Sequence, residues 1–142
     1  MAIPWEVRVS LRQGTVFYAR NRALTSSEPH YLVVVNRDPL AQNVLLVVVT
    51  TSQIEKAKKR VGIKGLSPDS VVSISKEEYS NFSKDSCVDC NTVISMSLDE
   101  FCEKMKAKEV RSHDDLPPEI LTKLVEAIRL SPLVAEEDKE KI

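Results

Sequence analysis

The sequence predicts a mainly β fold: a small curled antiparallel sheet, or open barrel, with a C-terminal packing helix. Two observations predict the sheet. Short β-branched runs, at residues 30–35 and 44–49, are separated by brief polar segments, and consecutive strands joined by short links usually pair as antiparallel neighbours. A third observation predicts the helix, because residues 116–130 repeat apolar side chains at helical spacing. The 142 residues are enough for one hydrophobic core, so we expect one domain over residues 1–142.

The first half of the chain predicts three strands. Residues 1–12 are expected to be a loose lead-in with one large anchor, Trp5. Residues 13–20 are rich in β-branched and aromatic side chains and predict the first strand, and residues 30–35 predict the second. We expect the fold to be organised around residues 43–58, because six consecutive apolar residues there predict a strand that is buried on both faces.

The second half predicts shorter elements. Residues 56–70 are basic and contain Gly and Pro, so we expect an excursion with one short strand at residues 61–63. Residues 71–74 and 86–91 predict two further strands, the second extended by residues 93–96.

Two helices follow. Residues 98–108 carry apolar side chains at helical spacing. The helix at residues 116–130 has two prolines in its first turn, where prolines are tolerated, and one apolar stripe. Residues 135–142 are expected to form a flexible charged tail.

The composition argues against several classes of protein. The hydrophobic share of 42% and charged share of 29% are those of a soluble globular protein. No signal-peptide core and no apolar run of membrane length is present, so we expect a cytoplasmic protein without a membrane partner. Cys87 and Cys90 form a CxxC, but they neither open a helix nor have a second pair of metal ligands nearby. We therefore expect reduced thiols on a strand, and neither a metal site nor a cofactor.

The charge is distributed unevenly. Residues 1–65 hold ten Lys and Arg against four Asp and Glu, a net charge of +6, whereas residues 66–142 hold ten against seventeen, a net charge of −7. The basic half suits a polyanion. The alternative is that these charges only solvate the protein surface.

Five strings, in this order, resemble the MazF/PemK/Kid family of toxin endoribonucleases, the mRNA interferases. QGTVFY, HYLVVVNRDP and VVVTTSQIEKAK resemble the family's first three strands, and FSKDSCVDCNTVISMSLDEF and LPPEILTKLVEAIRL resemble its later strand and closing helix. The resemblance covers residues 13–133 and implies a small SH3-like curled sheet of the MazF/CcdB type. Three features differ. His30 and Tyr31 occupy the positions of the family's Arg-Pro pair, and the loop before them keeps only Ser27 and Glu28 of the family's Gly-Ser-Glu-Gln signature. Residues 59–70 look like an insertion relative to shorter members.

The resemblance implies a metal-independent endoribonuclease that cleaves single-stranded RNA as the toxin of a type II toxin–antitoxin pair. It also implies a homodimer, an antitoxin protein as partner, no cofactor, and no DNA contact by this chain alone. The implied catalytic residues are His30, because imidazole can act as acid or base near neutral pH, and Thr51, as a donor to phosphate. The implied RNA-binding residues are Arg20, Arg22, Glu28, Ser52, Gln53, Lys56 and Lys58.

Each assignment has a structural alternative. A histidine that opens a strand is more often a surface residue than a catalyst, and Thr51 could cap the end of its strand. Phe17, Tyr18, Tyr79 and Phe82 are expected in the core or an interface, and His113 receives no role. The rival hypothesis is a catalytically silent member of the same fold that binds a protein, either an antitoxin or gyrase, because fold alone does not select the activity.

Overall fold

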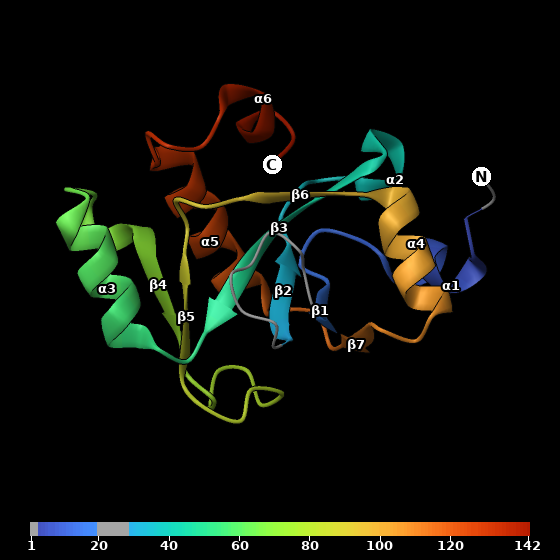
Figure 1. Cartoon of the computed structure of the whole chain (residues 1–142), viewed down its shortest axis with the longest axis horizontal. Coiled ribbons are helices and arrows are strands. Elements are labelled where there is room, and N and C mark those ends of the chain that lie inside the picture. The colour runs from blue at the N-terminus through green and yellow to red at the C-terminus, as the bar shows by residue number, and fades with distance from the viewer. Residues whose placement is uncertain (1–2, 20–28) are drawn as a thin grey trace.

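The computed structural model describes residues 3–19 and 29–142 and has an open antiparallel sheet flanked by helices (Figure 1). The strands are β1 (Val16–Ala19), β2 (His30–Val34), β3 (Val44–Thr51), β4 (Val71–Ile74), β5 (Ser86–Asp89), β6 (Ile94–Ser97) and β7 (Arg111–His113). The helices are α1 (Trp5–Ser10), α2 (Pro39–Gln42), α3 (Ile54–Ile63), α4 (Leu98–Lys106), α5 (Pro118–Leu130) and α6 (Glu136–Lys139), with a 3-10 turn, η1, at Pro68–Ser70. None of the described helices combines the length and apolar character needed to cross a lipid bilayer.

The described strands form one seven-stranded sheet in the order β4-β5-β3-β2-β1-β7, with β6 paired to β3. Every pairing is antiparallel. β4 and β7 end the two sides of the sheet and, in the described part of the chain, do not pair with each other, so the sheet does not close. The prediction of a mainly β fold with an open antiparallel sheet is confirmed.

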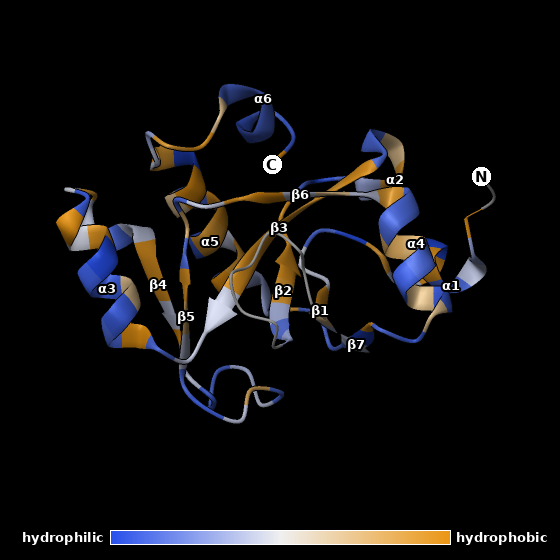
Figure 2. Cartoon of the chain, viewed as in Figure 1, coloured by the Kyte–Doolittle hydropathy of each residue, from blue (hydrophilic) through white to orange (hydrophobic). Residues whose placement is uncertain are grey.

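β3 is the central strand, as predicted. β2 pairs along one of its edges, while the other edge pairs with β6 at residues 44–47 and with β5 at Thr50 and Thr51. Residues 45–48 are at most 1% exposed. In Figure 2 the strand is orange along its length and pale at its C-terminal end, where the two threonines follow the apolar run.

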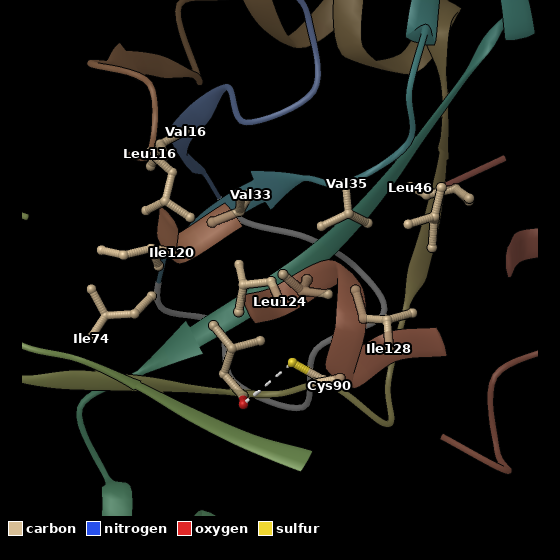
Figure 3. Close-up of a cluster of buried hydrophobic side chains, with 14 of the residues drawn as sticks. Val16, Val33, Val35, Leu46, Ile74, Cys90, Leu116, Ile120, Leu124 and Ile128 are labelled. Atoms are coloured by element: carbon tan, nitrogen blue, oxygen red, sulfur yellow. Dashed lines mark hydrogen bonds between the residues drawn. The ribbon is translucent and has the colours of Figure 1, made fainter. Parts of the chain in front are cut away.

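One face of the sheet packs on α5. Val33, Leu46 and Cys90 form one buried cluster with Leu124 and Ile128 of this helix (Figure 3). The predicted apolar stripe of α5 is therefore the surface that covers the sheet.

The opposite face is covered in two places. α1 and α4 cover the part formed by β1, β2 and the start of β3, where the rings of Phe17 and Phe101 have centroids 5.1 Å apart. α3 covers the part formed by β4 and β5, where Ala57 and Val61 form a buried cluster with Cys87. The end of β3 and the start of β2 lie between these two coverings on the same face.

The strand expected at residues 61–63 is wrong, because these residues belong to α3. The helix sequence IEKAKKRVGI contains good helix formers, and its two buried residues, Ala57 and Val61, are four positions apart. The turn that follows uses Gly65, whose φ of 71° is in the left-handed region that glycine adopts readily. With only two buried positions, the apolar signal was too sparse to distinguish helical from strand periodicity.

Both ends of the chain differ from the prediction. The N-terminal lead-in contains α1, which buries Val7, while the expected anchor Trp5 is 72% exposed. The expected flexible tail contains α6 and ends on Ile142, which is 1% exposed. Side chains from two other parts of the fold donate hydrogen bonds to the carbonyls of residues 140–142: Arg37, Gln42 and Arg129. The tail is therefore packed, because these distant donors satisfy its backbone.

Two strands are not those that the sequence predicts. Residues 93–96 do not extend β5, because a turn at Cys90 and Asn91 separates β6, which pairs with β3 instead. β7 has the polar sequence RSH and pairs with β1. Such a strand depends on its partner and has no local signal. Of the aromatic residues expected in the core or an interface, Phe17, Tyr79 and Phe82 are buried, whereas Tyr18 is half-buried.

Candidate functional site

β2 and β3, which are paired neighbours in the sheet, each carry one of the two residues to which the sequence gives catalytic roles. The strands pair through residues 32–34 and 47–49, and His30 and Thr51 each lie two residues beyond the last pair, Leu32 and Val49, at the same end of the two strands. The strands remain adjacent at the intervening position, where Thr50 Oγ1 donates a hydrogen bond to the Tyr31 carbonyl at 3.2 Å.

His30 and Thr51 are both half-buried. They project from the face that α1 and α4 cover at one end and α3 at the other. Because each is the terminal residue of its strand, the sheet fixes the backbone while part of the side chain remains accessible to solvent.

Thr51 has a structural role that leaves one hydrogen-bonding function available. Its Oγ1 accepts a hydrogen bond from the Gln53 backbone N–H at 3.1 Å. This bond directs the chain from β3 into α3, which is the structural alternative that the sequence suggested. A hydroxyl that accepts one bond still has its own proton to donate, so the two roles are compatible.

The N-terminus of α3 follows Thr51 directly. The ten-residue helix begins at Ile54, and its N-cap, Gln53, makes no side-chain capping bond. The first N–H groups of a helix point away from it and carry partial positive charge, which favours an anion. The exposed Lys56 and Lys58, in the first half of α3, add to this potential, whereas Glu55 in the first turn opposes it. The other exposed positive side chains lie further along the helix and its C-terminal turn: Lys59, Arg60 and Lys64.

The predicted RNA-binding residues divide into two groups. Arg20, Arg22 and Glu28 lie outside the described residues. The other four are exposed at the end of β3 or on α3: Ser52, Gln53, Lys56 and Lys58. All four therefore follow Thr51 within seven residues of the chain, in the turn before α3 or in the first half of that helix.

The opposite face carries an aromatic group that the sequence did not reveal. The Tyr31 ring lies 4.7 Å from Tyr18, 4.9 Å from Phe82 and 5.2 Å from His113, measured between ring centroids. His113 Nε2 is buried without a hydrogen-bond partner, and burial, with the charge of Arg111, lowers the pKa of His113. This group depends on the register of β7, β1 and β2, so no sequence spacing predicts it.

The CxxC motif does not form a site. Cys87 belongs to the cluster under α3, whereas Cys90 belongs to the cluster under α5, so the two thiols lie on opposite faces of the sheet. Both are free and buried. Burial raises the pKa of Cys87 and raises that of Cys90 to about 12. Within residues 3–19 and 29–142, no three His, Cys, Asp or Glu side chains are grouped so that they could hold a metal ion.

The chemistry available at the end of β3 is that of proton transfer beside an anion. An imidazole can accept or donate a proton, and a threonine hydroxyl can donate to an oxyanion. The helix N-terminus and the lysines of α3 supply positive charge. This set fits a phosphodiester better than a neutral ligand.

Three solved structures resemble this chain over most of its length. An endoribonuclease in complex with its cognate antitoxin, from mycobacterial species, has a TM-score of 0.51 and 10% identity, and the match covers 84% of this chain and 89% of that chain. Two crystal structures of MazE-MazF from Deinococcus radiodurans have TM-scores of 0.54 and 0.52 and identities of 9% and 8%. These matches cover 84% and 90% of this chain and 92% and 93% of those chains. No protein-family model and no curated protein sequence matches the chain. At these identities the likeness is one of fold.

Proposed function

Starting from its MazF-like toxin fold, we propose that this chain is a metal-independent endoribonuclease, the toxin of a type II toxin–antitoxin pair, which cleaves single-stranded RNA such as mRNA. The observation that supports the proposal best is that β2 begins with His30 and its paired neighbour β3 ends with Thr51, just before the N-terminus of α3. The similar structures include an endoribonuclease with its antitoxin and MazF with MazE, which supports the same class of function.

In the proposed reaction, the ribose 2′-hydroxyl attacks the adjacent phosphorus and the 5′-oxygen of the next nucleotide leaves. His30 accepts the proton of the 2′-hydroxyl while water protonates the leaving 5′-oxygen, or His30 protonates the leaving oxygen while water accepts the 2′-hydroxyl proton. Thr51 donates its hydroxyl proton to a non-bridging phosphate oxygen while Oγ1 keeps the bond from the Gln53 N–H. One P–O bond forms and one breaks, so the products are a 2′,3′-cyclic phosphate and a 5′-hydroxyl.

The proposed RNA-binding residues act on the backbone of the bound strand. Lys56 and Lys58 neutralise phosphates, and Ser52 and Gln53 donate hydrogen bonds at the exposed turn before α3. The family resemblance adds Arg20, Arg22 and Glu28 to this surface. We propose further that the protein acts as a homodimer in the cytoplasm and that an antitoxin protein neutralises it.

The test is cleavage of single-stranded RNA by purified protein in the presence of EDTA. We expect the wild type to cleave, and His30→Ala and Thr51→Ala to cleave at least about 100-fold more slowly, the usual size of a lost acid–base or oxyanion contact. Thr51→Ser keeps the hydroxyl and should retain most activity. Thr92→Ala, a matched change at an exposed threonine outside the site, should cleave like the wild type.

The second candidate function is a silent member of the same fold that binds a protein, either an antitoxin or gyrase. The observation that favours it is the presence of His30 and Tyr31 where the family has an Arg-Pro pair. If the wild type leaves RNAs of varied sequence intact but binds an antitoxin encoded beside it, this second function replaces the first.

A further inference from the structure

β4 leaves one edge of its backbone available for pairing. Within residues 3–19 and 29–142, β4 pairs with β5 alone. The Ser70 carbonyl, just before the strand, accepts a hydrogen bond from the Cys90 N–H at 2.9 Å. Backbone bonds to one neighbour recur at every second residue of an antiparallel strand. Residues 72 and 74 therefore bond to β5, and Ser73 directs its N–H and C=O to the outer edge.

The sequence of β4 does little to prevent another strand from pairing there. Edge strands are commonly protected by Lys, Pro or other charged residues. β4 has the sequence VVSI, with none of these. β7, at the other end of the sheet, carries Arg111 and His113. The two ends of the strand path therefore differ, because the edge of β7 is charged and that of β4 is not.

A cavity of about 390 Å³ opens beside this edge, between α3 and β4. Val61 and Gly62 of α3 line one side, Val71 and Ser73 of β4 line another, and Leu66 lies between the two elements. Because side chains alternate between the faces of a sheet, a strand added outside β4 would direct every second side chain to the face that carries this cavity. The walls suit an apolar side chain.

The surface around the cavity is strongly basic. Lys58 lines the cavity itself, and Lys56, Lys59 and Lys64 are exposed on α3 and its C-terminal turn. Glu55 is the only acidic residue of this helix. The positive charge favours an acidic partner. It does not favour a nucleic acid at this edge, because a phosphate backbone cannot pair with the alternating N–H and C=O groups of β4.

We propose that the outer edge of β4 binds an acidic, extended segment of a partner protein as an additional strand. The backbone of the segment pairs with Ser73, one apolar side chain enters the cavity beside Gly62, and carboxylates pair with the lysines of α3, Lys58 among them. This mode, strand addition with a pocket for an alternate side chain, gives affinity from the backbone and specificity from the cavity. The site shares Lys58 with the proposed RNA-binding surface, but it includes neither His30 nor Thr51 and does not depend on cleavage.

The test uses fluorescein-labelled decapeptides in which Asp or Glu alternates with Val, Leu or Phe, and a matched set with Lys in place of the acids. Binding is followed by fluorescence polarisation up to 1 mM peptide. We expect at least one acidic peptide, and no Lys peptide, to bind. In an extended peptide paired with β4, every second backbone amide faces β4 and the others face solvent. N-methylation of the amides of the bound acidic peptide that face β4 should therefore abolish binding, whereas N-methylation of the others should have little effect.

Two variants locate the site. Gly62→Leu should weaken binding at least ten-fold by filling the cavity, and it should fold, because a Cβ at Gly62 meets no atom within 4 Å. Lys58→Glu should also weaken binding at least ten-fold, whereas Lys106→Glu, on α4, should not. Gly62→Leu should cleave RNA like the wild type, so a failure of cleavage with intact peptide binding would count only against the proposed function. The inference is overturned if no acidic peptide binds, if Gly62→Leu binds equally well, or if oligouridylate binds at Gly62 in place of the peptides.

Discussion

Asn36 holds the connection between β2 and β3 and fixes the pairing of these strands. Its side chain is completely buried. Nδ2 donates to the Gln42 side chain at 2.9 Å and to the Val44 carbonyl at 2.8 Å, and Oδ1 accepts from the Leu46 backbone N–H at 2.9 Å. The carboxamide therefore satisfies backbone groups at the point where β3 begins, and any change in register would break these bonds.

The Asn36→Ala variant removes all three bonds. At about 1 kcal/mol each, their loss alone costs about 3 kcal/mol. The Val44 carbonyl and the Leu46 N–H then lose these partners inside the protein, which raises the expected loss to about 3–5 kcal/mol. Urea unfolding followed by circular dichroism measures it. With a slope of about 1–3 kcal/mol per molar urea, the midpoint should fall by at least about 1 M.

The matched control is Asn81→Ala. The Asn81 side chain donates to the exposed Asp114 carboxylate at 3.3 Å, so its loss should cost less than about 1 kcal/mol. If Asn36→Ala loses no more stability than Asn81→Ala, then the buried carboxamide does not hold the connection between β2 and β3.

Three further predictions concern the core, the thiols and pH. Leu124→Ala should lower the free energy of unfolding by about 2–5 kcal/mol, since Leu124 is completely buried, whereas Leu130→Ala, at a residue 82% exposed, should change it by less than about 0.5 kcal/mol. Burial raises the pKa values of all three buried thiols, Cys87, Cys90 and Cys102. At pH 8 they should therefore react with Ellman's reagent at least about ten-fold more slowly in the native protein than in guanidinium. Equal rates would contradict their burial. Because the pKa of His113 is lowered in the folded protein, the unfolded chain binds the proton more readily, and the free energy of unfolding should decrease as the pH falls below about 6.5. His113→Gln should reduce that dependence, and an identical pH profile for the variant would show that His113 does not cause it.

Elements with a local pattern could be predicted from the sequence. β3 was predictable because six consecutive apolar residues suit a strand buried on both faces. α5 was predictable because its prolines, acidic first turn and apolar stripe all indicate a helix. In both cases neighbouring residues hold the whole signal.

Elements that depend on distant partners could not be predicted. β7 forms a strand only because β1 lies beside it, and the C-terminal tail packs because Arg37, Gln42 and Arg129 bind its carbonyls. The same limit applied to the candidate site. The sequence suggested His30 and Thr51 individually, but their relative position depends on the register of β2 and β3. The helix α3 that follows Thr51 was not predicted, because most of its residues were expected to form an irregular segment.

The central claim is that His30 and Thr51 act together on one phosphodiester. The most direct test is RNA cleavage in EDTA by His30→Ala, Thr51→Ala and the double variant. Residues that act in one chemical step are strongly non-additive, so we expect the double variant to be little slower than the slower single variant. Independent, multiplying losses, or a wild type that leaves RNA intact, would contradict the claim.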